Sequence, residues 1–499
     1  MAFVWADWNV SVDANRVVLC KITYYDDSAS AEAVLYVGSR YYNDTINGNV
    51  YENTITANGI PTLFVGSSDV NNPTSIGIGN LVISNIDAKY DGLFADSFYG
   101  RDIEILVGPT ENAFADFQTV FKGVISKARF EDGKAISFEI RDYMDKLDMP
   151  VQRNRLSGGS MPTSAAGSLA PWAFGAAKNV KPILVHDTNW VFQTGDGAVE
   201  DPSVAVYIDA VLFSVSSEDT ANAQFTVIVE PAGDLTADIK GAKPGGSFVV
   251  DLGDVLTEIL TRDDDNSVSI LESAELETGS MSQLNTDCDM DIAIWFAPGQ
   301  EISTIDVLDQ LMPEGFLYGF NRDREFFAKV LLDPSGETAT QTLGTADIVL
   351  NGLTVLESIR PAWKVVCKYQ KNYAVIAQPG TGFTNAVFDA HSKDFRFTTS
   401  KEDSTIKTTH KDAREMTVEL MASSGVAAVT EERDRIFNLF SIRRRIYQVQ
   451  CWAKPLSFAV GDVTTITYPR YSMDSGVDLT FIGSENRLDS GLVTAYFWG

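Results

Sequence analysis

Hydrophobic and polar residues alternate with a period of two along the first third of the chain, and this pattern predicts short β-strands. The expected strands cover residues 34–37, 81–86, 103–107 and 135–140, and Gly, Asn, Asp and Pro separate them. In the last strand Ile136, Phe138 and Ile140 share one face, and the two polar residues between them face the other way. Residues 131–134, Glu-Asp-Gly-Lys, have the turn chemistry of a hairpin, and 141–148 predict a short helical or turn segment.

The middle third mixes strand patterns with helix patterns. Residues 204–215 and 224–229 predict strands. Residues 252–261 predict an amphipathic helix, because their apolar side chains recur at helical spacing. That stripe consists of Leu252, Val255, Leu256, Ile259 and Leu260.

A second helix is expected to begin after Ser303, whose side chain suits an N-cap. Asp306 stands at the capping-box position, and Ile302 and Val307 are spaced as a hydrophobic staple. The stretch that follows, residues 316–332, predicts a β-hairpin.

The last third is again mostly β, with one helix at 426–440 and a strand at 445–453. The buried face of the helix is expected to hold Val426, Val429, Ile436, Phe437 and Phe440. Glu431 and Arg435 are four residues apart, which predicts an ion pair. Residues 461–499 alternate again and end on Tyr-Phe-Trp-Gly. Because chain ends usually fray, this aromatic end predicts a strand that is docked in a sheet.

A chain of 499 residues is too long for one hydrophobic core, so several domains are expected. Residues 156–177 contain no Lys, Arg, Asp or Glu and are rich in Gly, Ser and Pro, which predicts a linker, although Trp172 and Phe174 indicate some packing. The fold class is therefore multidomain and mainly β, with a mixed α/β middle. The expected parts are a β-rich domain at 1–155, the linker at 156–177, a mixed domain at 178–345, and a β-rich domain with one helix at 346–499.

The formal net charge of −29 excludes a protein that grips nucleic acid, because such a surface repels phosphate. The first residues lack the basic and apolar regions of a signal peptide, and no run of about eighteen apolar residues occurs. The expected product is soluble and cytosolic when it is made.

The sequence predicts no catalytic, cofactor-binding or metal-binding site. Its four cysteines are scattered, with neither a C-x-x-C pair nor zinc-ligand spacing, so four free and buried thiols are expected. His186, His391 and His410 lie in unrelated settings, and there is no G-x-S-x-G or phosphate-binding loop.

Two acidic runs and one basic run have structural interpretations. Asp287, Asp289 and Asp291 match the first ligands of an EF-hand, but positions 6 and 12 of that loop do not match. A strand explains the run better, with its apolar residues turned inward, namely Cys288, Met290, Ile292, Ile294 and Phe296. The second acidic run, Asp263, Asp264 and Asp265, predicts a solvated turn and leaves a weak cation site open. The basic run, Arg443, Arg444 and Arg445, is expected to cap a helix or to pair with a neighbouring acidic surface, rather than to bind DNA.

The C-terminal stretch 461–499 resembles the C-terminal module of tail-tip, or baseplate, hub proteins of long-tailed, siphovirus-like bacteriophages. Further stretches resemble the same family in the same order along the chain, at 81–108, 121–150, 303–332 and 363–372. The resemblance implies a structural assembly protein and not an enzyme.

Members of this family form a trimeric ring beneath the tail tube, and each subunit supplies two tube-like β-barrel domains. The resemblance therefore implies such domains in the N-terminal and C-terminal thirds, and a homotrimer at the virion tail tip that is assembled in the bacterial cytoplasm. It also implies contacts with the distal tail protein, the tape-measure protein and the tail fibre or spike proteins, with DNA only passing during ejection. Some tail-tip proteins carry an iron–sulfur cluster, but the four cysteines here lack the spacing for one.

Two alternative functions stay open. A tail-associated cell-wall hydrolase would need a catalytic constellation, and the sequence shows none. A host-surface carbohydrate-binding β-protein would expose aromatic platforms, for which Trp172, Trp190 and Trp363 are candidates, although buried packing is the commoner role of tryptophan.

Overall fold

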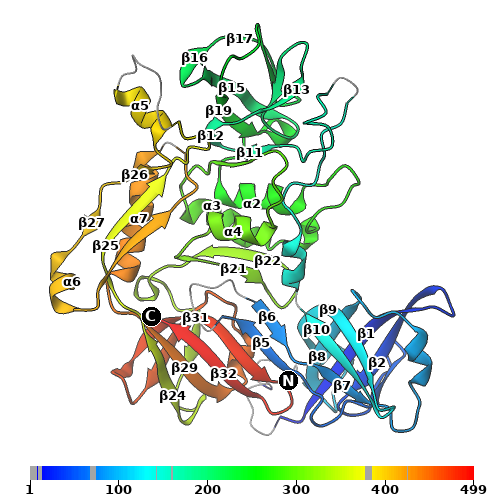
Figure 1. The fold of residues 1–499 in the computed structure, drawn as a ribbon. Coiled ribbons are helices and arrows are strands. Elements are labelled where there is room, and N and C mark those ends of the chain that lie inside the picture. Colours follow the sequence, from blue (N-terminus) through cyan, green and yellow to red (C-terminus); the bar gives the residue numbers. More distant parts are fainter. Residues whose placement is uncertain are drawn as a thin grey trace.

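The computed structural model describes residues 8, 14–67, 75–141, 143–158, 161–376, 385–423 and 425–499. The fold is mainly β and is divided among several separate sheets, which confirms the predicted class. Figure 1 shows two large sheets side by side at one end of the molecule, a layer with helices next to them, and smaller sheets at the opposite end.

The N-terminal sheet has eight strands in the order β3-β4-β2-β1-β8-β9-β10-β7. They are β1 (Arg16–Asp26), β2 (Ala31–Gly38), β3 (Tyr42–Asp44), β4 (Asn49–Asn53), β7 (Leu81–Ser84), β8 (Asp102–Pro109), β9 (Gln118–Glu131) and β10 (Ala135–Arg141). The four strands predicted here are confirmed. The β9–β10 turn is built as its sequence predicts, since Asp132 and Gly133 have φ angles of 49° and 65°. Ser137 differs from its prediction, because it is buried although it lies between core-facing residues.

The C-terminal sheet also has eight strands, and its main path runs β23-β30-β31-β32-β29-β24. The strands are β23 (Gln341–Leu343), β24 (Ile348–Ser358), β29 (Arg445–Trp452), β30 (Val463–Tyr468), β31 (Met473–Arg487) and β32 (Leu492–Trp498), joined by β5 (Thr62–Gly66) and β6 (Ser75–Ile78). Strand β32 pairs with β29 on one side and β31 on the other, and Trp498 is fully buried. The prediction of a docked C-terminal strand is confirmed.

Strand β5 links the N-terminal third of the chain to the C-terminal third, because it pairs antiparallel with β31 of the C-terminal sheet. Gly66 and Gly483 face each other in this register. A Cβ atom on Gly66 would lie 2.1 Å from the carbonyl oxygen of Ile482, and one on Gly483 would lie 2.6 Å from that of Val65. Gly66 also has a φ of 91°, which side chains disfavour. This crossing therefore requires glycine.

The layer between the large and small sheets contains α2 (Leu252–Thr261), α3 (Thr278–Asp287), α4 (Thr304–Leu311) and the hairpin of β21 (Phe316–Phe320) and β22 (Phe326–Val330). The two predicted helices and the hairpin are confirmed. All five residues of the predicted α2 stripe are buried. Ser303 caps α4, since its hydroxyl accepts a hydrogen bond from the backbone N–H of Asp306 at 3.2 Å.

The strand interpretation of Asp287, Asp289 and Asp291 is wrong in part. Asp287 ends helix α3, and regular strand β20 begins only at Ile294 (Ile294–Phe296). The alternating burial is nevertheless present, because the apolar residues of the run are buried while Asp289 and Asp291 are exposed. An extended segment gives the same alternation as a strand without requiring a hydrogen-bonded neighbour.

The small sheets at the far end comprise two four-stranded sheets and one strand pair. Their strands are β11 (Trp172–Phe174, paired with β20), β12 (Ala176–Val180), β13 (Ile183–His186), β14 (Val191–Gln193), β15 (Val199–Ile208), β16 (Val211–Phe213), β17 (Val215–Asp219), β18 (Gln224–Val227) and β19 (Leu235–Ala242). The single strand predicted at 204–215 is wrong, because a turn at Asp209 and Ala210 divides it. Both residues have positive φ, at 48° and 66°, and the Asp209 carboxylate accepts a hydrogen bond from the backbone N–H of Asp234.

The stretch 156–177 is not a loop throughout, because it contains β11 and the start of β12. Trp172 and Phe174 are buried, as their aromatic character indicates. Exposed residues lie earlier in the stretch, for example Thr163 and Gly167. The domain boundaries at 155, 177 and 345 stay predictions.

The remaining part is a sheet around β25 (Ala362–Tyr369), with β26 (Arg396–Phe397), β27 (Lys401–Glu402) and β28 (Arg414–Glu419), accompanied by α5 (Asn385–Ser392), α6 (Ser404–Thr409) and α7 (Val426–Phe440). Short 3₁₀ helices occupy Asp91–Ala95, Phe114–Asp116, Tyr143–Asp148, Pro244–Gly246, Ser273–Glu275, Pro334–Gly336 and Lys454–Ser457. The 3₁₀ helix at Tyr143–Asp148 confirms the short helical segment predicted after β10.

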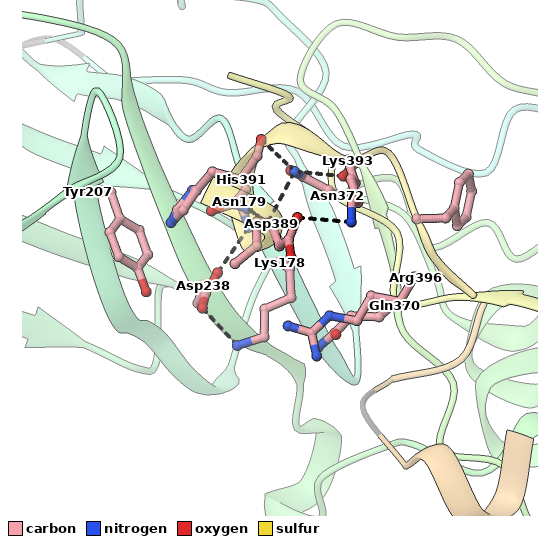
Figure 2. A pocket seen from close by; sticks show the side chains of 12 residues that line it. Lys178, Asn179, Tyr207, Asp238, Gln370, Asn372, Asp389, His391, Lys393 and Arg396 are labelled. Atoms are coloured by element: carbon pink, nitrogen blue, oxygen red, sulfur yellow. Dashed lines mark hydrogen bonds and ion pairs between the residues drawn. The ribbon is translucent and has the colours of Figure 1, made fainter. Parts of the chain in front are cut away.

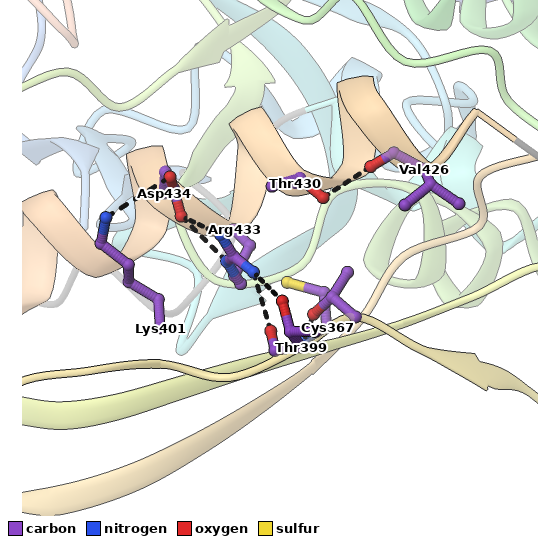
Figure 3. Close-up of polar contacts among 8 residues, drawn as sticks. Cys367, Thr399, Lys401, Val426, Thr430, Arg433 and Asp434 are labelled. Carbon is purple, nitrogen blue, oxygen red and sulfur yellow. Dashed lines mark hydrogen bonds and ion pairs between the residues drawn. The ribbon is translucent and has the colours of Figure 1, made fainter.

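Helix α7 is fastened by buried arginines, as Figure 3 shows for Arg433. The Arg433 guanidinium donates to the carbonyl oxygen and the hydroxyl of Thr399 at 2.8 and 2.9 Å, and Asp434 faces Lys401 at 3.6 Å. Arg435 pairs with Glu432, three residues away, and not with Glu431 as predicted. Glu432 lies on the buried face of the helix beside Arg435, which explains the choice.

One residue of the predicted α7 face is wrong, because Val426 at the first position of the helix is 51% exposed. The other predicted residues of that face are buried. The first turn of α7 therefore extends beyond the core that covers the rest of the helix.

The arginine run after α7 is a capping device, in agreement with its prediction. Arg444 is buried and its Nε donates to the carbonyl oxygen of Leu439 at 2.9 Å, near the end of the helix. Its guanidinium also pairs with Asp333 at 2.6 Å and lies 4.8 Å from the ring centre of Trp498. Arg444 thus ties α7 to the last strand of the C-terminal sheet.

We expect Gly66→Ala to lower the free energy of unfolding by about 2–4 kcal/mol, since it combines a left-handed φ with a backbone clash. Gly48→Ala is the matched control, because Gly48 has a φ of 75° but a Cβ atom there would meet no other atom within 4 Å. The control should cost only about 1 kcal/mol. Urea unfolding of the full chain, followed by tryptophan fluorescence, measures both. Equal losses in the two variants would contradict the close β5–β31 approach.

Candidate functional site

The sequence motifs that could hold a metal ion do not assemble into a site. Within the residues that the structure describes, no group of three or more His, Cys, Asp or Glu side chains is placed to bind a metal. In the acidic run at 263–265, the Asp264 carboxylate accepts backbone N–H groups from Asn266 and Val268, and Asp263 and Asp265 are exposed. The run is a turn stabilised by its own side chain.

The four cysteines, Cys20, Cys288, Cys367 and Cys451, are free and buried, as predicted. Burial raises the pKa of Cys288 and of Cys367 to about 12, and it also raises the pKa of Cys20 and of Cys451. Thiolates, not thiols, are nucleophiles and metal ligands. None of the four is therefore prepared for chemistry at neutral pH.

The three histidines lie in separate places, and one of them lines a pocket. His186 accepts a hydrogen bond from the backbone N–H of Asn189 in a turn. His391 is 4% exposed and packs edge-on against Tyr207, with 4.7 Å between ring centres. Burial lowers the pKa of His391.

The pocket beside His391 lies between the small-sheet strands and the segment that follows β25, and it has a volume of about 90 Å³ (Figure 2). Strands β12, β15 and β19 provide Lys178, Asn179, Tyr207 and Asp238. The other wall comes from residues 370–372 and 389–396, including Gln370, Asn372, Asp389, Lys393 and Arg396. Backbone hydrogen bonding joins the two walls, since the N–H of Tyr373 donates to the carbonyl oxygen of Lys178.

Ion pairs organise most of the charges in this pocket. Asp238 accepts from the Lys178 ammonium at 2.7 Å and from the backbone N–H of Asn179 at 3.0 Å. Asp389 pairs with Lys393 at 2.9 Å. The Asn372 side chain donates to the carbonyl oxygen of His391 at 3.0 Å and so shapes the wall.

Sequence reasoning did not find this pocket. His391 was the only residue of it that the sequence singled out, and no partner for it was visible. The residues come from five separate segments of the chain, and tertiary contacts bring them together. A left-handed φ at Asn179 and at Gln370, 51° and 50°, is a structural signal that residue spacing does not reveal.

The three tryptophans that were candidates for carbohydrate platforms do not form a shared surface. Trp172 is 4% exposed and packs against Phe174. Trp363 is covered by the Lys407 ammonium, 4.0 Å from its ring centre. Trp190 is partly buried and packs against the core of the small sheets.

Exposed apolar residues occur on edge strands. Strand β24 lies at one end of the main path of the C-terminal sheet and carries Leu350, 87% exposed, and Leu356, 50% exposed. Strand β16 lies at the edge of a small sheet and carries Val211 and Leu212, both exposed. Unpaired edges with apolar side chains are surfaces suited to protein contacts. In the part of the chain that the structure describes, no helix has both the length and the apolar composition to span a membrane.

No family model and no curated protein matches the chain. Among solved structures, it is similar to the tail protein from Neisseria meningitidis MC58, with a TM-score of 0.40, 10% identity and 97% coverage of each chain. It is also similar to the 43 kDa tail protein of prophage MuSo2 from Shewanella oneidensis, with a TM-score of 0.38, 8% identity and 97% coverage of each chain. The prophage tail protein gp18 from Listeria monocytogenes EGD-e gives a TM-score of 0.33 and 8% identity over 97% of this chain and 94% of that one. All three are named as tail proteins, the class that the sequence resembles.

We expect the native chain to react with less than about one equivalent of Ellman's reagent at pH 8, because each thiol is buried and protonated there. After denaturation in urea all four cysteines should react. The same burial should make the free energy of unfolding fall as pH rises from about 9 towards 12, since only unfolded thiols ionise in that range. Below about pH 8 the contribution of the buried thiols to the free energy of unfolding is complete and does not change with pH. Rapid labelling of the native chain would contradict this account.

Proposed function

We propose that the chain is a structural tail-tip, or baseplate, hub protein of a long-tailed bacteriophage. The observation that carries this proposal is the pair of eight-stranded sheets, built from opposite ends of the sequence and joined by β5 and β31. Two large β-units in one subunit are what a hub needs if three chains are to match a six-fold tube. The ordered resemblance of five sequence stretches supports the same class.

In this role the chain closes the distal end of the tail tube as a homotrimer. It joins the tube, through the distal tail protein and the tape-measure protein, to the fibre or spike proteins. The edge strand β24, with Leu350 exposed, is suited to a contact between proteins. A trimer closes by three-fold rotation, and each interface joins two different patches, the same two on every subunit.

The charge supports passage of DNA without binding. With a net charge of −29, the path for DNA would be lined mainly by carboxylates, which offer no counterion-releasing contacts to phosphate. In the one dense basic run, Arg444 is buried and Arg443 pairs with Asp412, so two of its three charges are already engaged within the chain. The chain would thus repel the DNA that passes it while the phage genome is delivered.

We propose that the chain performs no catalysis. A tail-associated cell-wall hydrolase is the alternative, and peptidoglycan zymography separates the two classes. The full chain should leave no cleared zone, because its sequence has no nucleophile motif, its four cysteines are buried, and its described residues form no metal-binding cluster. A cleared zone that persists after purification would favour the hydrolase.

We expect three copies of the chain in each tail tip, arranged with three-fold symmetry, and cryo-electron microscopy of the particle measures this number. Leu350→Lys should reduce incorporation into tail tips without lowering the unfolding temperature, because it places a charge on an exposed edge strand. Val229→Lys, at an exposed site in the bend after β18, is the control and should be incorporated normally. One or six copies would contradict the trimer, and equal incorporation of both variants would contradict the β24 contact.

A further inference from the structure

The pocket between the small sheets and the β25 segment contains three buried polar atoms without a hydrogen-bond partner. They are Oδ1 of Asn179, Oε1 of Gln370 and Nδ1 of His391. The three residues are only 3%, 8% and 4% exposed. Buried polar groups are nearly always paired, so three unpaired atoms that line one pocket point to a bound group that supplies donors.

The second observation is a cation without a partner. Lys178 and Lys393 are both held in ion pairs, whereas Arg396 is exposed and has no ion pair among the described residues. Figure 2 shows the Arg396 guanidinium and the Lys178 ammonium turned towards the same side of the pocket. In a chain of net charge −29, this is a local site for an anion.

The arrangement favours a small organic acid over a metal cation. A cation at the two amide oxygens would be repelled by Lys178 and Arg396. A guanidinium is suited to a carboxylate, which it can bind through two parallel hydrogen bonds. The amide oxygens of Asn179 and Gln370 can only accept, so the same ligand must carry O–H or N–H donors. The unpartnered Nδ1 of His391 adds a further polar atom that a ligand can pair with.

We propose that this pocket binds a carboxylate ligand that carries hydroxyl groups, the chemistry shared by an acidic sugar and a hydroxy acid. The carboxylate lies at the unpaired Arg396, on the side of the pocket to which the Asp238-paired Lys178 also turns, and the hydroxyl groups donate to the amide oxygens of Asn179 and Gln370. Tyr207 and Phe395 line the pocket and offer aromatic surface to the carbon skeleton. The pocket has a volume of about 90 Å³. One water needs about 10–15 Å³ by the same measure, so the pocket has room for roughly six to nine waters or for one small acid in their place. This activity is additional to the structural role and does not depend on it.

Isothermal titration of the full chain with four probes tests the proposal. The probes are glucuronate, lactate, glucose and acetate. Glucuronate or lactate should bind at least about tenfold more tightly than both glucose and acetate, because only the first two combine carboxylate and hydroxyl groups. Tighter binding of glucuronate identifies the sugar source, and equal or tighter binding of lactate identifies the hydroxy acid. The proposal is overturned if neither glucuronate nor lactate binds, or if acetate binds as tightly as both of them. The pocket then holds ordered water.

Two variants locate the binding. Arg396→Gln should weaken the binding of glucuronate or lactate, whichever binds more tightly, by about tenfold or more. Folding is not at risk because Arg396 is exposed. Arg470→Gln is the matched control, since Arg470 is an exposed arginine in the β30–β31 turn, and it should bind like the unaltered chain. Gln370→Met removes one acceptor at similar side-chain length and should also weaken binding at an unchanged unfolding temperature. Unaltered binding by Arg396→Gln overturns the proposed site.

Discussion

The pairing of β5 with β31 is the constraint on which the arrangement of this molecule depends. It brings residue 66 of the N-terminal third against residue 483 of the C-terminal third, so that one sheet contains both parts of the chain. The two glycines in register allow the backbones to approach without side chains. This seam fixes the N-terminal third against the C-terminal sheet, and the pair of sheets is what gives the subunit two large β-units side by side.

Local rules in the sequence predict helices α2, α4 and α7, but they miss α3, α5 and α6. The N-cap at Ser303 and the stripe from Leu252 to Leu260 are signals contained within one or two turns. The sequence predictions fail where contacts with other parts of the chain determine the outcome. Arg435 pairs with Glu432, which tertiary packing buries, and Val426 in the first turn of α7 is exposed. The apolar run 204–215 conceals a turn, since the run of strand-forming residues continues up to Asp209 and resumes directly after Ala210.

The pocket illustrates the limit of reading chemistry from spacing. Lys178, Asp238 and Arg396 are separated by many residues, and each looks like an ordinary surface charge in its own segment. Only the fold shows that two of them neutralise each other and that the third is left over. The cysteines are the opposite case, because their scattered spacing already predicts four free and buried thiols. The fold has all four free and buried, and burial keeps them protonated at neutral pH.

The seam at β5 also governs how the chain must fold. Residues 483–487 of β31 find their neighbour more than 400 positions earlier in the sequence, so the contact can form only after a very long loop has closed. Such distant pairings form slowly. Until β5 arrives, half of one side of β31 is an open edge that another chain can occupy. A fragment beginning at residue 346 would keep this edge permanently bare, so the C-terminal sheet is prone to aggregate when it is separated from the N-terminal third.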